Sequence, residues 1–342
     1  MKQNYLLGLV LAGLTSLPMQ AQVNQFPKVW GQQAPKPQFA LSQKQLKAPS
    51  AIDDKSKGIV VYAGERMDES KKRSFIKFNS KENGKFTRLK HYILNEKEEY
   101  EQNFGMIMGA YDGKDYYAIF GYSFTYSNQG RFLAKVDMQT GDTTVVRTFS
   151  KAEQDSWYGD GVYGDFRTAL YDMAYDRNTN TLYALGYGWA DDGSYGFSKL
   201  YAVDREKGTW DLVTNFDCIY YEFCFDYDGN MYATRPKAGK DGETNEGTEL
   251  VKLDKDFNEV SAKELTDEWG GTMVLAQFGA LGVDNATNTL YWMPATQWGA
   301  TSLYTINPET AQYTWCNGYY PGNWFTGFYI PYLAADNRGA AA

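Results

Sequence analysis

Histidine and cysteine are scarce in this chain of 342 residues, which contains one His, at position 91, and three Cys. A zinc site of ordinary spacing needs about four Cys or His ligands, so none is predicted. A Ser-His-Asp or Cys-His nucleophile would have to use His91, which we interpret as a structural residue. The sequence therefore predicts no metal site and no cofactor, and it disfavours hydrolases that depend on those nucleophiles.

The low cysteine count also predicts that no disulfide forms. Exported proteins usually pair their cysteines, but an odd number cannot pair completely. Cys218 and Cys224 flank one apolar run, and an extended strand holds two such residues too far apart to bond. We interpret Cys218, Cys224 and Cys316 as small apolar residues of the core.

Positive charge is also in short supply. Lys and Arg number 34 against 42 Asp and Glu, which gives a formal net charge of −8 at pH 7. A nucleic-acid-binding protein needs a basic face to contact phosphates, so that class is excluded. The acidic balance likewise disfavours anionic ligands.

Long apolar runs are missing beyond a short one at the start of the chain, from Tyr5 to Leu14. This run is too short to cross a membrane. Because Lys2 precedes it and Pro18 and Ala21 follow, residues 1–21 are predicted to be a secretory signal peptide. We therefore expect a secreted protein without membrane insertion after cleavage, and the choice between periplasm, cell surface and medium stays open.

Aromatic residues, by contrast, are abundant, with 28 Tyr, 19 Phe and 9 Trp beside 33 Gly. This composition favours strands over helices and excludes disorder for most of the chain. Residues 22–57 are the exception, since they are rich in Pro, Gln and Lys and predict an extended or disordered lead-in. The small polar residues 335–342 predict a flexible tail, which leaves 58–334 as the folded domain.

One pattern recurs five times within that domain. An apolar stretch ends in Asp or Asn at positions 79, 137, 204, 254 and 307, with separations of 58, 67, 50 and 53 residues. Each copy alternates apolar and polar residues, and turn sequences such as DGKD, DRNTN and DYDGN divide it into short strands. Repeats of about 50 residues with four strands each are typical of a β-propeller.

The first repeat lacks an innermost strand, and the end of the chain offers one at Phe325–Leu333. Pairing this strand with the first blade would close the ring and remove its open edges. We therefore predict an all-β, five-bladed propeller closed by its C-terminal strand. Six blades is the alternative, and it would require strands hidden within residues 151–167.

The repeats resemble known propeller families. Asp284–Met293 (DNATNTLYWM) is similar to YWTD repeats, and Leu200–Gly208 (LYAVDREKG) is similar to NHL and quinoprotein-like blades. The chain as a whole resembles exported bacterial propeller proteins. The resemblance implies a propeller fold and an exported location, and it implies no particular activity.

Tryptophans gather on one predicted face. The connections between blades and those between the second and third strands of a blade share this side, here called the first face. Loops usually favour small polar residues, so the Trp residues expected there need a reason. They predict either an aromatic platform that stacks on sugars or apolar side chains, or loops that bury their own Trp. The candidates are Trp157, Trp189, Trp269, Trp298 and Trp324.

The insertion at residues 151–167 resembles a binding loop most closely. It joins Trp157 and Tyr158 to the polar groups Asp165 and Arg167, and its glycines allow close approach to a ligand. We predict that these residues bind the ligand together with Trp189, Tyr221, Glu222, Trp298 and Trp324. A mobile insertion without a ligand is the alternative.

Two carboxylates are expected on adjacent innermost strands. Aligning Asp176 with Asp226 in the repeat places Asp172 opposite Glu222, while the fifth repeat has Ala280 there. Two carboxyl groups near one axis could act as general acid and general base, as in glycoside hydrolysis.

The function predicted from these patterns is an exported, non-catalytic, monomeric propeller that binds a glycan or a protein, with cell adhesion as one role. A glycoside hydrolase or lyase that uses Asp172 and Glu222 is the alternative. A scaffold module of a cell-surface assembly is a third hypothesis, with the aromatic face as its protein interface.

Export makes the first testable prediction. Expressed in a host that exports it, the chain should be cut after Ala21 and begin at Gln22, because the h-region ends just before that small residue. Intact-mass measurement and N-terminal sequencing of the exported protein check this. A protein that still carries Met1 would contradict the assignment, and Ala21→Arg serves as the cleavage-blocked control.

Overall fold

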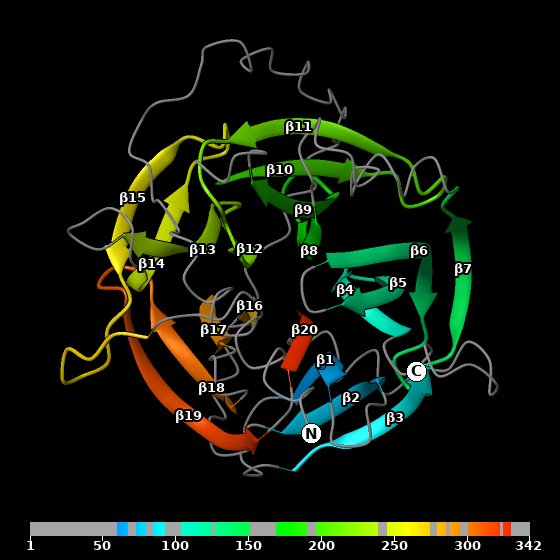
Figure 1. Cartoon of the computed structure of the whole chain (residues 1–342), viewed down its shortest axis with the longest axis horizontal. Coiled ribbons are helices and arrows are strands. Elements are labelled where there is room, and N and C mark those ends of the chain that lie inside the picture. The colour runs from blue at the N-terminus through cyan, green and yellow to red at the C-terminus, as the bar shows by residue number, and fades with distance from the viewer. Residues whose placement is uncertain are drawn as a thin grey trace, which may run out of the picture.

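Five antiparallel sheets of four strands each surround a central axis in the part of the chain that the structure describes (Figure 1). The chain is an all-β, five-bladed propeller, as predicted. None of the described segments forms a helix long and apolar enough to cross a membrane. The computed structural model describes residues 60–67, 73–79, 85–92, 104–124, 127–150, 169–189, 196–238, 245–273, 279–284, 288–294, 300–321 and 324–329.

The five blades are ordered from the axis outward. Blade 1 consists of β20 (Trp324–Tyr329), β1 (Val60–Met67), β2 (Arg73–Asn79) and β3 (Thr87–Tyr92). Blade 2 consists of β4 (Phe104–Tyr111), β5 (Tyr116–Phe124), β6 (Ser127–Val136) and β7 (Thr143–Thr148). Blade 3 consists of β8 (Ala169–Asp176), β9 (Thr181–Trp189), β10 (Gly196–Val203) and β11 (Trp210–Phe216). Blade 4 consists of β12 (Phe223–Phe225), β13 (Met231–Ala238), β14 (Asn245–Leu253) and β15 (Glu259–Glu264). Blade 5 consists of β16 (Gly279–Asp284), β17 (Thr289–Pro294), β18 (Ala300–Asn307) and β19 (Gln312–Pro321).

The last strand closes the ring. β20 pairs antiparallel with β1, with Tyr329 opposite Tyr62 and Trp324 opposite Met67, and this ladder has two irregularities. The red strand therefore lies beside the blue one in Figure 1, although they come from opposite ends of the domain. The predicted closure is confirmed, and the strand supplies the innermost edge that the first repeat lacks.

Aspartate sets the tight turns within the blades. The carboxylate of Asp112 accepts hydrogen bonds from the backbone N–H groups of Lys114 and Asp115, at 2.9 and 2.8 Å. Asp137 and Asp204 do the same for the two N–H groups that lie two and three residues after them. The side chain thus satisfies donors that a sharp turn leaves unpaired, which is why the repeats place Asp or Asn there.

The turns between first and second strands connect neighbouring blades on the second face, opposite the first. The side-chain amide of Asn178 in blade 3 donates to the carbonyl of Tyr227 in blade 4, at 3.0 Å. The N–H of Tyr227 in turn donates to Oδ1 of Asn288 in blade 5, at 2.8 Å. The inner turns of blades 3, 4 and 5 are therefore joined in sequence, which fixes the inner strands that they connect.

The turns between third and fourth strands rest on the outer strand of the preceding blade. Gly141 and Gly208 both have positive φ, and a Cβ there would meet the Cβ of Lys90 or Arg147 at about 2.6 and 2.7 Å. Glycine is thus required for two reasons, the backbone angle and the close approach of the preceding blade. Arg147 also donates to the carbonyl of Gly208 at 3.1 Å.

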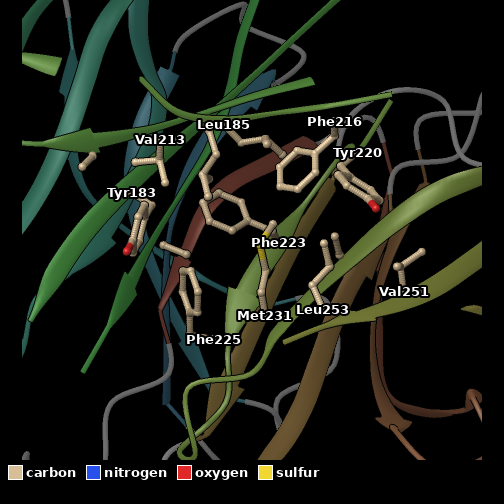
Figure 2. Close-up of a cluster of buried hydrophobic side chains, with 14 residues drawn as sticks. Tyr183, Leu185, Val213, Phe216, Tyr220, Phe223, Phe225, Met231, Val251 and Leu253 are labelled. Atoms are coloured by element: carbon tan, nitrogen blue, oxygen red, sulfur yellow. The ribbon is translucent and has the colours of Figure 1, made fainter. Parts of the chain in front are cut away.

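Each seam between blades holds its own apolar cluster. Between blades 3 and 4, Phe223, Phe225 and Met231 pack against Leu185 and Val213, as Figure 2 shows. The remaining four clusters occupy the other seams in the same way. Burying a large apolar side chain contributes about 2 to 3 kcal/mol, so blade contacts rather than isolated sheets stabilise the ring.

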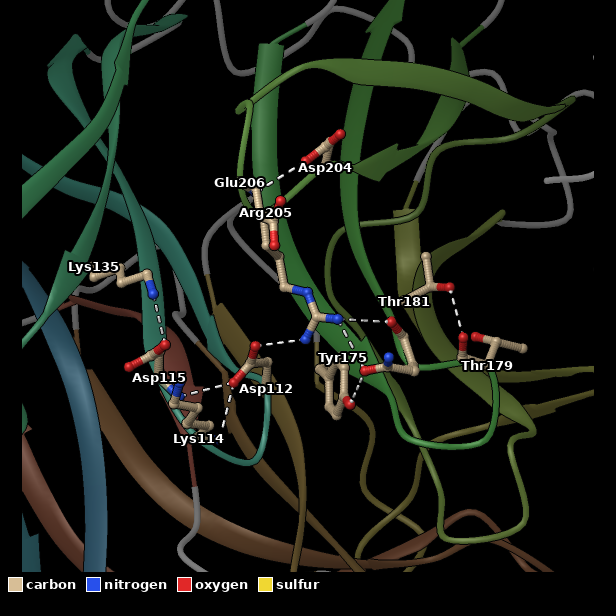
Figure 3. A network of polar contacts seen from close by, with 11 residues as sticks. Asp112, Lys114, Asp115, Lys135, Tyr175, Thr179, Thr181, Asp204, Arg205 and Glu206 are labelled. Atoms are coloured by element: carbon tan, nitrogen blue, oxygen red, sulfur yellow. Dashed lines mark hydrogen bonds and ion pairs between the residues drawn. The ribbon is translucent and has the colours of Figure 1, made fainter. Parts of the chain in front are cut away.

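One buried ion pair joins blades 2 and 3. Arg205, in the turn between β10 and β11, contacts Asp112 of the β4–β5 turn with 2.5 Å between Nη1 and Oδ2 (Figure 3). The same guanidinium donates to both oxygen atoms of Asn180 and lies over the ring of Tyr175, 5.5 Å from its centre. Only 7% of the Asp112 side chain is exposed, so Arg205 compensates a nearly buried charge.

Two predictions from the sequence concern the cysteines and the connection between β5 and β6. The three cysteines are free, as predicted, with Cys224 buried and the other two half-buried. The sequence also predicts a long loop at residues 121–130 within the second repeat; this prediction is wrong, because β5 and β6 continue into that segment and pair from Phe124 and Ser127 inward. The Gly and aromatic residues of this segment are typical of a loop, but they are also compatible with antiparallel strand pairing.

The ion pair gives a prediction for stability. Arg205→Ala should lower the free energy of unfolding by about 1 to 3 kcal/mol, because it removes the charged partner of the Asp112 carboxylate, which keeps its two backbone N–H donors. Chemical denaturation monitored by circular dichroism measures this. Lys207→Ala is the control, since that lysine is 77% exposed and should change stability by less than about 0.5 kcal/mol. Equal effects of the two variants would contradict the prediction.

Candidate functional site

The two predicted carboxylates come from the innermost strands of blades 3 and 4. Asp172 belongs to β8, and Glu222 directly precedes β12. Glu222 stays in the ladder, because Thr234 donates its N–H to the Glu222 carbonyl and Tyr221 donates to the Thr234 carbonyl. Asp172 is 3% exposed and Glu222 is 1% exposed. The repeat alignment therefore identified two buried acidic groups on neighbouring inner strands.

Backbone amides hold the Asp172 carboxylate across the seam between blades 3 and 4. Oδ1 accepts a hydrogen bond from the N–H of Met173 at 2.9 Å, and Oδ2 accepts one from the N–H of Phe223 at 3.0 Å. The β8–β9 ladder shifts register between Leu170 and Asp172, which turns the side chain toward β12. Two N–H donors stabilise negative charge on this carboxylate despite its burial.

Glu222 has the opposite environment, in the seam between blades 4 and 5. The hydroxyl of Thr234 donates to Oε2, and Oε1 has no hydrogen-bond partner among the described residues. Burial raises the pKa of Glu222 to about 7, and the Thr234 hydrogen bond opposes that rise. The side chain is therefore an acid that keeps its proton up to neutral pH.

Unequal environments of two neighbouring carboxyl groups separate their chemical roles. A buried carboxyl without a charged partner keeps a proton to donate, whereas a carboxylate held by N–H groups is ready to accept one. Asp172 accepts from the N–H of Phe223, the residue after Glu222, but the two side chains enter different seams, between blades 3 and 4 and between blades 4 and 5. Each carboxyl group by itself is suited to proton transfer.

The fold itself does not require acidic groups at these positions. The residue four places before the Asp of the inner turn is Asp172 in blade 3 and Glu222 in blade 4, but Met108 in blade 2 and Ala280 in blade 5. Met108 and Ala280 are fully buried in apolar clusters. Because two blades close with apolar residues here, the carboxyl groups of blades 3 and 4 need another explanation.

Two neighbours of the carboxyl groups were missed by sequence reasoning. Thr234 interrupts a position that is otherwise apolar in the repeat, where Ile119, Leu185 and Met293 stand, and this break was the available signal. Tyr116 is fully buried, and burial raises its pKa well above the usual value, with smaller contributions from Tyr92 and Asp172. Its ring lies over the bare backbone of Gly109.

The aromatic residues predicted to bind a ligand do not lie in loops of the first face where the structure describes them. Tyr221 is 2% exposed and belongs to the cluster between blades 4 and 5. Trp189 and Trp324, expected in loops, are the last residue of β9 and the first of β20, because the ladders extend to Gly196 and Met67. Five further predicted ligand contacts lie outside the described residues: Trp157, Tyr158, Asp165, Arg167 and Trp298.

Trp269 is the described tryptophan that most faces solvent, with 83% of it exposed. It lies in the connection between blades 4 and 5, where Oδ1 of Asp267 accepts the N–H groups of Trp269 and Gly271 at 2.9 and 2.6 Å. The turn is thus held by its own hydrogen bonds while its indole points outward. Within the described part of the chain, no group of three or more His, Cys, Asp and Glu is placed to hold a metal ion.

Comparison with known proteins gives similarity of fold alone. No protein-family model and no curated sequence matches the chain, so the likeness to YWTD and NHL repeats stays a prediction. The chain is similar to the GH43_1 enzyme from Xanthomonas citri complexed with xylose, with a TM-score of 0.45, 11% identity, and 62% and 73% of the two chains covered.

Similar values come from two further structures. A GH43 β-xylosidase/α-arabinofuranosidase from a compost metagenome has a TM-score of 0.45 and 11% identity, with 67% of this chain and 91% of that chain covered. A putative 6-phosphogluconolactonase from Bacteroides fragilis has a TM-score of 0.39 and 11% identity, with 81% and 99% covered. These similarities assign no activity to the chain.

The site predicts a pH-dependent stability. Glu222 has an ordinary pKa near 4.5 when unfolded and about 7 when folded, so the unfolded chain loses this proton first as pH rises. The contribution of Glu222 to folding is therefore fully present below about pH 4.5 and is lost by pH 8, a change of roughly 3 kcal/mol.

Denaturation of the wild type and Glu222→Gln between pH 4 and 8 measures this change. The stability of the wild type relative to Glu222→Gln should fall across that range. Glu206→Gln, in an exposed turn, is the control and should follow the wild type. Parallel curves for the wild type and Glu222→Gln would show that Glu222 titrates at its ordinary pKa.

Proposed function

We propose that this propeller is a glycan-cleaving enzyme, a glycoside hydrolase or lyase, in which Glu222 is the general acid and Asp172 is the base. The observation that carries the proposal is the unequal pair of buried carboxyl groups in the two seams that flank blade 4. One holds a proton near neutral pH, and backbone amides hold the other as an acceptor. Neither group is required by the packing of the equivalent position in blades 2 and 5.

Hydrolysis uses both groups on one glycosidic bond. Glu222 donates its proton to the oxygen that leaves with the departing sugar, so that no alkoxide is expelled. Asp172 takes a proton from the attacking water, or attacks the anomeric carbon itself and is released by water afterwards. In the first route Asp172 then releases its proton to solvent and Glu222 takes one up; in the second, the water that releases Asp172 gives its proton to Glu222. Both routes consume one water.

A lyase would use the same two groups differently. Asp172 would then remove a proton from a carbon next to a sugar carboxyl group, while Glu222 protonates the leaving oxygen, and no water is consumed. The products differ accordingly, since hydrolysis adds the mass of water and elimination leaves a double bond. Both carboxyl groups are buried, so either reaction requires substrate binding to open the axial region.

Glycan or protein binding without catalysis is the second candidate, and Trp269 supports it. An indole that is 83% exposed on a turn fixed by Asp267 offers a flat apolar face at little cost in conformational entropy. The proposed ligand contacts Trp157, Tyr158, Asp165, Arg167 and Trp298, together with Trp189 and Trp324, would extend such a surface. Export to the periplasm, cell surface or medium and a monomeric state belong to both candidates as proposals.

Carboxylate substitution separates the two candidates. Against a panel of neutral and acidic glycans, Asp172→Asn and Glu222→Gln should each lower turnover about 100-fold or more, because each removes a proton-transfer step. Product mass spectrometry gives the turnover, and tryptophan fluorescence with the same samples gives the binding. Trp269→Ala should keep the turnover of the wild type, and circular dichroism confirms that each variant is folded.

The opposite result would favour binding alone. In that case the wild type would bind a glycan or peptide without forming products, the carboxylate variants would bind equally well, and Trp269→Ala would lose the fluorescence change. Turnover by the wild type that survives in both carboxylate variants would exclude the proposed roles of Asp172 and Glu222.

A further inference from the structure

The carboxyl group of Glu222 lies directly against the backbone of β16. A Cβ atom at Gly279 would overlap Oε1 of Glu222, would lie 3.1 Å from its carboxyl carbon, and would lie 3.0 Å from the carbonyl oxygen of Met293. An overlap of that kind is not found around real Cβ atoms. The space that the Glu222 carboxyl group occupies therefore exists because residue 279 has no side chain.

The equivalent place in the ladder carries a large side chain in blades 2 and 3. Where blade 5 has Gly279 opposite Pro294, blade 2 has Met106 and blade 3 has Leu170. Blade 5 is also the blade that faces Glu222 across a seam. The small residue thus coincides with the seam into which this glutamate points.

Backbone geometry does not explain this glycine. Gly279 pairs with Pro294 as the first residue of β16, and its φ is not in the left-handed region that favours glycine. Glycine inside a strand weakens it, since the unfolded chain gains freedom and no side chain packs. Close approach of another group is the usual reason for glycine in a strand, and here that group is Glu222.

We propose that Gly279 is a positioning residue of the axial site, which admits the Glu222 carboxyl group into the seam between blades 4 and 5 and holds it there beside Thr234. The inference rests on the proposed function, in which Glu222 is the general acid. A methyl group at position 279 cannot displace the Met293 carbonyl, which is part of the β16–β17 sheet, so the flexible glutamate must move.

Gly279→Ala tests the inference through the titration of Glu222. Carbon-13 NMR of glutamate carboxyl groups, with Glu222→Gln to assign the signal, gives the midpoint without any substrate. The expected result is a downward shift of at least about one pH unit, because a displaced carboxyl group is better solvated. In the enzyme assay, kcat should fall about 10-fold or more with little change in KM, and the high-pH limb should move with the midpoint.

A matched glycine and a rescue variant sharpen the test. In Gly247→Ala the new Cβ meets Oε1 of Glu264 at 3.0 Å, and that partly exposed carboxylate pairs with Lys237, so neither the Glu222 midpoint nor turnover should change. Glu222→Asp shortens the acid by one methylene, so adding Gly279→Ala to it should cost far less than in the wild type. This non-additivity also keeps the test decisive if Gly279→Ala alone folds poorly.

Each outcome either supports or overturns the positioning role. A Glu222 midpoint that Gly279→Ala leaves unchanged would overturn it, and so would equal costs of that substitution in the wild type and in Glu222→Asp, even if the chain is an enzyme. A shifted midpoint in a protein that cleaves none of the glycans supports the positioning role and removes the proposed catalysis. A shifted midpoint together with lost turnover supports both.

Discussion

Pairing of β20 with β1 is the contact on which the other four blades depend. It joins the end of the folded domain to its start, so the first blade gains its inner strand and the ring has no open edge. Each apolar cluster lies between two blades and so needs both neighbours in place. Closure therefore couples all five seams, and it brings the inner strands close enough for side chains of one blade to bond the backbone of the next.

Closure of the ring also sets the environments of the two carboxyl groups on the inner strands. Asp172 reaches the backbone of β12 across one seam, and Glu222 reaches β16 across the next, so neither environment exists within a single blade. An apolar residue at either position would close the seam equally well, as Met108 and Ala280 do. Keeping Glu222 there costs stability near neutral pH, which is typical of residues retained for function rather than for folding.

Particular residues show how far sequence reasoning reached. The turn aspartates fix the repeat, and counting back from Asp176 and Asp226 placed Asp172 and Glu222 on adjacent inner strands. The same counting could not reveal that Gly279 faces Glu222, because the pattern gives positions along a blade and not the contacts between blades. It also placed Trp189 and Trp324 in loops, since the ends of ladders are set by the pairing strand rather than by local propensity.

The sequence by itself determined the all-β class, the five repeats, the closing strand and the pair of inner acids. These follow from local rules, because side-chain alternation and Asp turns depend only on residues near one another in the chain. Only the tertiary structure decided that Asp172 is held by amides while Glu222 is buried, with no charged partner in the part of the chain that the structure describes. That difference depends on which backbone atoms the next blade presents to each carboxyl group. Local sequence patterns do not predict such contacts, because the residues involved are 50 or more positions apart in the chain.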